Sequence, residues 1–110
     1  MITIVELPGY LARVRKILTV AEQEAVKVMI VKDPTCGALI RGTGGLRKVR
    51  FARQGGGKSG GTRVIYYYHS DKIPVFLVTA FTKARQDNLT DAQQNELAKI
   101  VKATIEAYRR

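Results

Sequence analysis

Three strand-like runs follow one another in the second half of the chain, and their succession limits the folds open to it. The runs are GGLRKVRFAR, TRVIYYYHSD and IPVFLVTAFTK, and the last two are rich in β-branched and aromatic residues. Ser70, Asp71 and Lys72 give a tight turn between the last two runs, and glycine-rich residues 55–61 join the first two. Short connections of this kind link antiparallel neighbours. The pattern therefore predicts a three-stranded antiparallel meander.

A strand and a helix are predicted before the meander. ITIVEL, residues 2–7, has the composition of a short strand, and Pro8 with Gly9 ends it. Residues 10–18 then carry apolar side chains at helical spacing, which are those of Leu11, Val14, Ile17 and Leu18.

Two capping boxes mark the starts of two further helices. Thr19 with Glu22 opens a helix from about residue 20 to residue 31, and Thr90 with Gln93 opens one from residue 91 to about residue 108. The predicted buried side chains are Ala25, Val28, Met29 and Val31 in the first of these helices, and Leu97, Ile100, Val101, Thr104 and Ile105 in the second.

The predicted order is strand, helix, helix, three strands and a final helix. Such an order is typical of the α+β class, with helices segregated against a small antiparallel sheet. A chain of 110 residues can bury a core without metals or disulfides, and we found neither an internal repeat nor a domain boundary. We therefore expect one domain over residues 1–110.

The positive charge is concentrated in the middle of the chain. The formal net charge is +10, and no acidic residue stands between Asp33 and Asp71. The cations within that segment are Arg41, Arg47, Lys48, Arg50, Arg53, Lys58 and Arg63. Nine of the ten glycines lie there too, so the segment combines cations with accessible backbone, which suits phosphate groups. The sequence favours an anionic partner, and a merely solvated charged face is the alternative.

The segment GGGKSGG, residues 55–61, resembles a nucleotide-binding phosphate loop only superficially. That motif requires a glycine five positions before the Gly57-Lys58-Ser59 triplet, where this chain has Ala52. A helix must also follow, whereas TRVIYYY has the character of a strand. The segment is better interpreted as a glycine-rich hairpin connection.

Cysteine usage and hydropathy indicate the compartment. Cys36 is the single cysteine and has no partner for an internal disulfide, and MITIVELPGY lacks the basic start of a signal peptide. No apolar run reaches the length of a membrane-spanning helix. We expect a cytoplasmic protein with no membrane association, no cofactor and no metal.

Side-chain alternation separates a core face from a cationic face in the meander. Val49 and Phe51 fall on one face of the first strand, and Lys48 and Arg50 fall on the other. In the second strand Tyr66 and Tyr68 share parity with Val64, which predicts that they belong to the core. Tyr67 shares the face of Arg63, where its ring would meet a nucleic-acid base.

His69, the only histidine, is a poor candidate for a general base beside Arg63. The two residues are six positions apart on one strand, which separates them by roughly 20 Å at about 3.3 Å per residue.

A family resemblance joins these features. GTGGLRKVRFARQGGGKSGGTRVIYYY, followed by VFLVTAFTKARQDNLTDAQQNELAKIV, resembles the RelE-type toxins of bacterial toxin–antitoxin modules, most closely their HigB-like branch. The resemblance covers roughly residues 33–101. Its motifs are the basic strand, the glycine-rich hairpin, R-V-I-Y-Y, the T-K that ends the last strand, and N-L-T-D/N-x-Q at the start of the final helix.

The resemblance implies a fold, an activity and two partners. The fold is α+β and RelE-like, with an N-terminal strand and two helices packed on a small twisted antiparallel sheet, and a C-terminal helix. The activity is metal-independent, ribosome-dependent cleavage of messenger RNA in the A site, next to 16S ribosomal RNA. The second partner is a silencing antitoxin, often a helix-turn-helix DNA-binding protein.

The resemblance also implies roles for individual residues. Lys48 and Arg50 match an active-site basic pair, Arg63 matches a phosphate-stabilising arginine, and Lys83 matches a closing basic position. Alternatively, Lys48 and Arg50 only contact phosphate groups and take no part in the reaction. Family members often carry a tyrosine beyond the last strand, and KARQDNL has none, so the general acid and base stay unassigned. The predicted contacts to RNA or the ribosome are Arg47, Arg53, Lys58, Tyr67 and Arg85.

Two other functions are compatible with the same fold. A related branch, the ParE-type toxins, inhibits DNA gyrase and cleaves no RNA. A basic nucleic-acid-binding module without toxicity is the other alternative. The cations predicted on the open face of the sheet favour cleavage of RNA.

Overall fold

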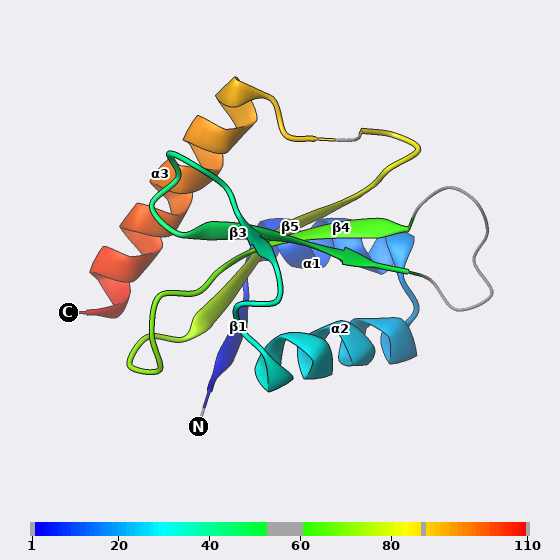
Figure 1. Ribbon diagram of the computed structural model, residues 1–110, viewed down its shortest axis with the longest axis horizontal. Coiled ribbons are helices and arrows are strands. Elements are labelled where there is room, and N and C mark those ends of the chain that lie inside the picture. Colours follow the sequence, from blue (N-terminus) through cyan, green and yellow to red (C-terminus); the bar gives the residue numbers. More distant parts are fainter. Residues whose placement is uncertain (1, 53–60, 87, 110) are drawn as a thin grey trace.

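The structure is a computed structural model that describes residues 2–52, 61–86 and 88–109. A five-stranded sheet lies between helices on its two faces (Figure 1). The elements are β1 (Ile4–Glu6), α1 (Pro8–Ile17), α2 (Val20–Lys32), β2 (Ala38–Leu39), β3 (Leu46–Phe51), β4 (Thr62–Tyr67), β5 (Val75–Thr82) and α3 (Asp91–Tyr108). The α+β class is confirmed, and the elements follow the predicted order except for the additional short strand β2.

The sheet has the order β1-β5-β4-β3-β2 and is mixed rather than wholly antiparallel. The predicted meander of β3, β4 and β5 is confirmed, since both of its pairings are antiparallel. β1 pairs parallel with β5, which corrects the expectation of an antiparallel sheet. Two helices and three strands separate β1 from β5 in the chain, so no tight turn fixes their relative direction. The two-residue strand β2 was not predicted.

Each face of the sheet has its own apolar core. Side chains of α1 and α2, including Val14 and Ile30, pack against Val64 and Tyr66 of β4 on one face. On the other face Ile65 and Tyr67 of β4 join Val101 of α3. Successive side chains of β4 therefore point into the two cores in turn, and all six residues of the strand are buried.

The helix boundaries follow the local chemistry. Both predicted capping boxes form, because the hydroxyl groups of Thr19 and Thr90 accept from the third residue of each helix. α1 begins at Pro8 and not after Gly9, which corrects the prediction that these residues only end the first strand. Proline fits the first turn of a helix because the missing N–H has no partner there.

The predicted buried face of α2 was wrong for three of its four residues. Val26 and Ile30 are fully buried and Met29 is half-buried, whereas Ala25, Val28 and Val31 are exposed. The apolar residues of α2 are distributed around its whole circumference, so their spacing did not identify which face is buried. In α3, Val101 is buried as predicted, Leu97, Thr104 and Ile105 are half-buried, and Ile100 is 43% exposed.

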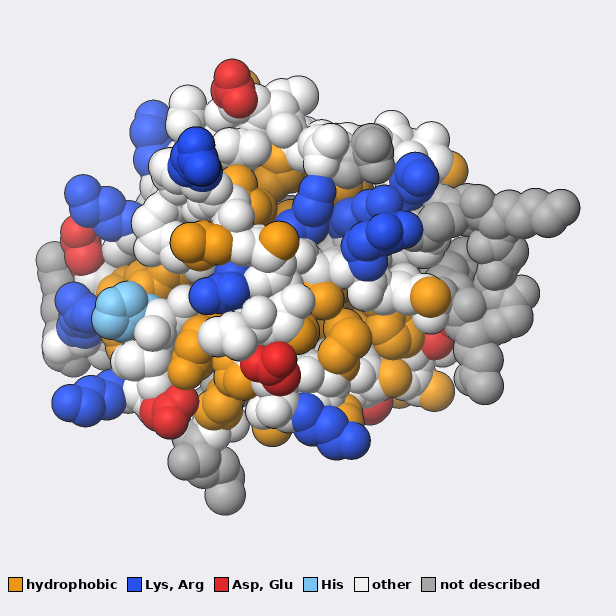
Figure 2. Space-filling model, in the orientation of Figure 1, with side chains coloured by type: hydrophobic (Ala, Val, Ile, Leu, Met, Phe, Trp, Pro, Cys, Tyr) orange, Lys and Arg blue, Asp and Glu red, His pale blue; other side chains and the backbone are white. Residues whose placement is uncertain are grey.

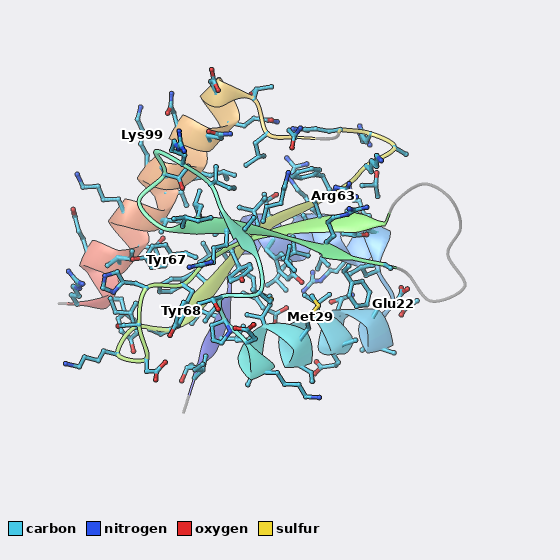
Figure 3. All side chains as sticks on the ribbon, in the orientation of Figure 1. Glu22, Met29, Arg63, Tyr67, Tyr68 and Lys99 are labelled. Atoms are coloured by element: carbon cyan, nitrogen blue, oxygen red, sulfur yellow. The ribbon has the colours of Figure 1, made fainter. Side chains whose placement is uncertain are left out.

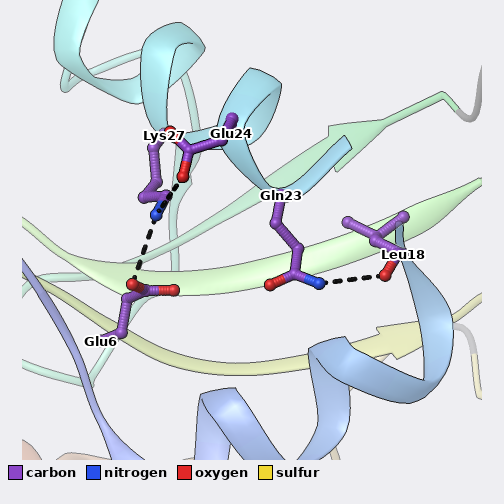
Figure 4. Close-up of polar contacts among 5 residues, drawn as sticks. All are labelled: Glu6, Leu18, Gln23, Glu24 and Lys27. Carbon is purple, nitrogen blue, oxygen red and sulfur yellow. Dashed lines mark hydrogen bonds and ion pairs between the residues drawn. The ribbon is translucent and has the colours of Figure 1, made fainter. Parts of the chain in front are cut away.

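A small polar network fixes α2 in place (Figure 4). The Lys27 ammonium lies 2.8 Å from a carboxylate oxygen of Glu24 and 3.4 Å from one of Glu6 on β1. Its bond to Glu24 is the main reason that the pKa of Lys27 is raised. The Gln23 side-chain amide donates to the Leu18 carbonyl at 3.0 Å. α2 is therefore held to β1 and to the end of α1 by polar contacts as well as by packing.

Tyr66 connects the sheet to the segment between α2 and β2. Its fully buried hydroxyl accepts from the Gly37 N–H at 2.8 Å and donates to the Pro34 carbonyl at 2.7 Å. Burial raises the pKa of Tyr66, so the phenol stays neutral. Gly37 has no room for a side chain, since an added Cβ would lie 2.8 Å from the Tyr66 ring. The prediction that Tyr66 is a core residue is confirmed, while Tyr68 is half-buried.

Tyr10→Phe is expected to leave the free energy of unfolding at pH 7 unchanged or up to about 1 kcal/mol higher. The Tyr10 hydroxyl is buried and has no hydrogen-bond partner among the residues that the structure describes. Burial, and then the charge of Glu6, raise the pKa of Tyr10 from 10.0 to about 12. The folded state thus holds this proton more tightly than the unfolded chain. The resulting stability is present below pH 10 and is lost as the pH rises through 12.

Urea titrations of both proteins at neutral pH and above pH 10 check this prediction. The variant should lose less stability than the parent over the alkaline interval. Parallel losses in the two proteins would contradict the assignment to Tyr10.

Candidate active site

The cations predicted on the open face of the meander do lie together. In the register of β3 with β4, Arg50 is paired with Arg63 and Lys48 is paired with Ile65. Paired residues project to the same face, so Lys48, Arg50 and Arg63 share one face of two adjacent strands. Val49 on the opposite face is 7% exposed and belongs to the core, as the alternation predicted.

Arg63 occupies the most enclosed position of the three. Its side chain is 5% exposed, and its cross-strand neighbours are Arg50 on β3 and Phe81 on β5. Lys48 is half-buried and Arg50 is exposed. Figure 3 shows Arg63 near the start of β4, on the side of the sheet away from α2. A guanidinium is a planar fork of N–H donors, a geometry that matches phosphate oxygens, and enclosure holds that of Arg63 in one orientation, whereas Arg50 extends outwards.

The backbone around the start of β4 depends on Gly61. Its φ is +77°, and an added Cβ would lie 2.5 Å from the Phe51 carbonyl oxygen. Gly61 accepts from the backbone N–H of Lys83 at 3.2 Å. Glycine at this position therefore lets the ends of β3, β4 and β5 approach one another, next to Arg63.

Lys83 and Arg85 follow the end of β5. Both side chains are exposed, and the N–H of Arg85 donates to the Thr82 carbonyl at 3.1 Å in a tight turn. The backbone contact with Gly61 places Lys83 at the same end of the sheet as Arg63. Figure 2 shows Lys and Arg side chains gathered at this end, below the segment that leads into α3.

Lys48 is linked to the start of α3 by side chains that the sequence interpretation left without a role. The Lys48 ammonium donates to the Asn88 side-chain oxygen at 2.6 Å. The Gln86 side-chain amide donates to the Asn88 backbone carbonyl at 2.8 Å and to the Gln93 side-chain oxygen at 2.6 Å. The same Gln93 oxygen accepts from the Thr90 N–H in the capping box. Asn88 was part of the N-L-T-D motif, but only the tertiary structure brings it to a residue 40 positions away.

Two predicted RNA contacts, Arg47 and Tyr67, are not exposed on the face of Arg63. Arg47 lies on the opposite face, paired with Tyr66, and its guanidinium donates to the backbone carbonyls of Gly37 at 2.8 Å and Thr35 at 3.4 Å. Tyr67 shares the face of Arg63 as predicted, but it is 5% exposed and packs on Phe76. The expectation that Tyr67 meets a base is therefore corrected, because α3 covers this part of the face.

Burial also raises the pKa of Tyr67, which keeps its phenol protonated. The predicted contacts Arg53 and Lys58 lie outside the described residues. His69 is exposed beyond the far end of β4.

Arg50 and Lys83 are exposed at the surface of the sheet, Lys48 is half-buried, and Arg63 beside them is 5% exposed. A cavity of about 520 Å³ lies between α1, β5 and α3, and its lining combines apolar side chains such as Val78, Phe81 and Leu97 with polar ones such as Arg13, Gln86 and Glu96. None of the four candidate catalytic residues, Lys48, Arg50, Arg63 and Lys83, lines it. An open cationic face is suited to a polymer that passes across it, such as a nucleic-acid strand.

The geometry defines a class of protein: small, basic and α+β, with cations across one face of an antiparallel meander. The family model described as the RelE toxin of the RelE / RelB toxin–antitoxin system matches residues 10–110, and the chain belongs to this family. No helix within the described part of the chain is long and apolar enough to cross a membrane.

A solved structure supports the fold. This chain is similar to E. coli toxin RelE, solved as a doubly substituted mutant in the free state, with a TM-score of 0.56 and 21% sequence identity. The match covers 78% of this chain and 87% of the E. coli chain. At this level of identity the similarity concerns the fold alone.

Proposed function

We propose that this protein is a ribosome-dependent, metal-independent mRNA endonuclease that inhibits translation and is silenced by a cognate antitoxin. The observation that carries the proposal is the pairing of Arg63 with Arg50 across β3 and β4, with Lys48 on the same face. Membership of the RelE toxin family supports it. We further propose that the protein belongs to the HigB-like branch, acts in the ribosomal A site and is located in the cytoplasm.

The reaction requires three things of the site. The ribose 2′-hydroxyl attacks the adjacent phosphorus, and its proton passes to a base. The bond from phosphorus to the 5′-oxygen breaks, and that oxygen receives a proton. The products are a 2′,3′-cyclic phosphate and a 5′-hydroxyl, and the intermediate phosphorane carries additional negative charge on its oxygens. Fixed cations that meet this developing charge lower the barrier, and they need no metal to do so.

The residues divide these tasks according to how exposed they are. Arg63, enclosed between Arg50 and Phe81, holds the phosphorane oxygens, because its donors are fixed in advance. Lys48, oriented by Asn88, moves a proton or binds a second phosphate oxygen. Arg50, Lys83 and Arg85 are exposed and hold the strand through its flanking phosphates.

Messenger RNA cleavage tests the proposal directly. The protein is expressed alone in bacteria, and the 5′ ends of messenger RNA are mapped within minutes of induction; the purified protein is also added to ribosomes carrying a defined message. Cuts within translated frames that require the ribosome are the expected result. Intact messages in arrested cells would contradict the proposal and point to gyrase, and unarrested growth would point to a binding module without toxicity.

Asn88→Ala is expected to slow cleavage on programmed ribosomes by about 3- to 10-fold, the equivalent of one lost hydrogen bond. The amide oxygen orients Lys48 without touching the phosphate, so the rate of cleavage should fall more than ribosome binding does. Single-turnover cleavage over a range of ribosome concentrations separates these two effects.

Asn95→Ala, an exposed asparagine on α3, is the matched control and should cleave at the parent rate. Asn88→Asp retains an oxygen acceptor for Lys48 and should recover part of the activity. If the Asn88→Ala and Asn95→Ala proteins cleave equally fast, Asn88 has no positioning role.

A further inference from the structure

A second cavity lies at the end of the meander opposite to Arg63. Its volume is about 320 Å³, and the turn between β4 and β5 and the end of α3 line it, through His69, Ser70, Lys72, Ile73, Tyr108 and Arg109. His69 is six residues beyond Arg63, so the cavity is roughly 20 Å from the candidate active site at about 3.3 Å per residue. Whatever it binds is therefore distinct from the reacting phosphate.

The floor of the cavity is apolar and aromatic. Ile73 is 8% exposed, whereas Tyr108 is 54% exposed. The ring of Tyr108 stands edge-on to Phe76, with the ring centroids 6.3 Å apart and an interplanar angle of 79°. This contact orients the ring while leaving about half of the residue open to solvent. A half-open aromatic ring beside an apolar floor is suited to stacking with a planar base.

The rim of the cavity is cationic. Lys72 and Arg109 are exposed and reach it from two different elements, with His69 beside them. Among the described residues that line the cavity none carries a carboxylate; the nearby Asp71 accepts a hydrogen bond from the Tyr68 hydroxyl at 3.1 Å. In Figure 2, Lys and Arg side chains gather over this end of the molecule, interspersed with acidic ones.

We propose that this cavity binds one unpaired nucleotide of an RNA strand. The base lies against Tyr108 above Ile73, and its phosphate contacts Lys72 and Arg109. Cations alone would bind any polyanion, and an apolar floor alone would bind any apolar group. A planar aromatic group joined to an anion is the ligand that uses both, and a strand with unpaired bases presents it. The inference rests on the proposed function only in taking the strand to be RNA.

Fluorescence anisotropy with a labelled oligouridine of about eight nucleotides tests the site. Tyr108→Leu should weaken binding roughly 5- to 100-fold, the range for loss of one stacked base, and Tyr108→Phe should bind like the parent. Lys72→Ala with Arg109→Ala should weaken binding and lower the salt dependence, with the slope falling by about one for each lost phosphate contact.

Controls separate this site from the overall charge and from the catalytic cations. Lys99→Ala with Lys102→Ala removes the same charge from exposed positions of α3 outside the cavity lining and should weaken binding far less. A duplex of the same strand with oligoadenosine hides its bases, so its affinity should not depend on Tyr108. Equal losses in the two double variants, parent-like binding by Tyr108→Leu, or Tyr108-dependent binding of the duplex would each overturn the site.

The outcome is separable from that for the endonuclease. Binding that depends on Tyr108 in a protein that leaves ribosome-bound mRNA intact would retain this site and refute the proposed function. If the parent protein cleaves mRNA but the cavity variants bind oligouridine as the parent does, the proposed function is retained and this site is refuted.

Discussion

Arg63→Ala is expected to lower the rate of ribosome-dependent mRNA cleavage by about 100- to 1000-fold, the usual effect of removing one fixed donor to a developing charge. Arg63 is the enclosed cation of the site, directly across from Arg50 and 5% exposed, so no neighbouring side chain can take its place without movement. Single-turnover cleavage on programmed ribosomes is the measurement. Growth arrest after induction should disappear in parallel.

Two further variants show whether geometry or charge matters. Arg63→Lys retains the charge but loses the planar fork and should remain at least about 10-fold slower than the parent. Arg41→Ala, an exposed arginine before β3, should cleave normally. Circular dichroism and antitoxin binding would show that the fold of each variant is intact. Cleavage by a folded Arg63→Ala protein at a rate within about 3-fold of the parent would remove Arg63 from the site.

Tyr66→Phe is expected to lower the free energy of unfolding by about 2 kcal/mol, since a buried backbone N–H and a part-buried carbonyl lose a partner. The lost bonds are those to the Gly37 N–H and the Pro34 carbonyl, which join β4 to the segment after α2. Removing one hydroxyl leaves the ring in place, so the effect isolates these hydrogen bonds from packing. Urea denaturation of both proteins measures the difference.

Tyr68→Phe is the matched control for this change. Its hydroxyl donates to Asp71 at an exposed site, where water replaces the lost partner, and its cost should stay below about 0.5 kcal/mol. A similar loss of stability in both variants would mean that the buried network does not hold this segment.

Alternation predicted the cationic face correctly, because the period of a strand is a local property of the backbone. Lys48 and Arg50 were assigned to one side of their strand and Val49 to the other, as the structure shows. Capping chemistry is local as well, and both predicted boxes form. Parity alone could not show that α3 covers Tyr67, because the docking of a helix depends on residues distant in the chain.

The site was predicted less completely than the fold. The resemblance supplied the candidate roles of Lys48, Arg50, Arg63 and Lys83, and these roles remain predictions. The sequence did not reveal that Asn88 meets Lys48, since 40 positions separate them and no periodic pattern connects them. It also did not show that Arg47 turns towards the carbonyls of Gly37 and Thr35, away from the other cations.

Local sequence patterns were enough to predict the meander, the helix starts, the concentration of charge and the face on which Lys48 and Arg50 stand. These follow from turn chemistry, capping and side-chain period, which act over a few residues. Three features emerged only from the folded molecule: the parallel pairing of β1 with β5, the buried face of α2 and the enclosure of Arg63. Each of these depends on packing between elements far apart in the chain, where the burial of apolar surface outweighs local preference.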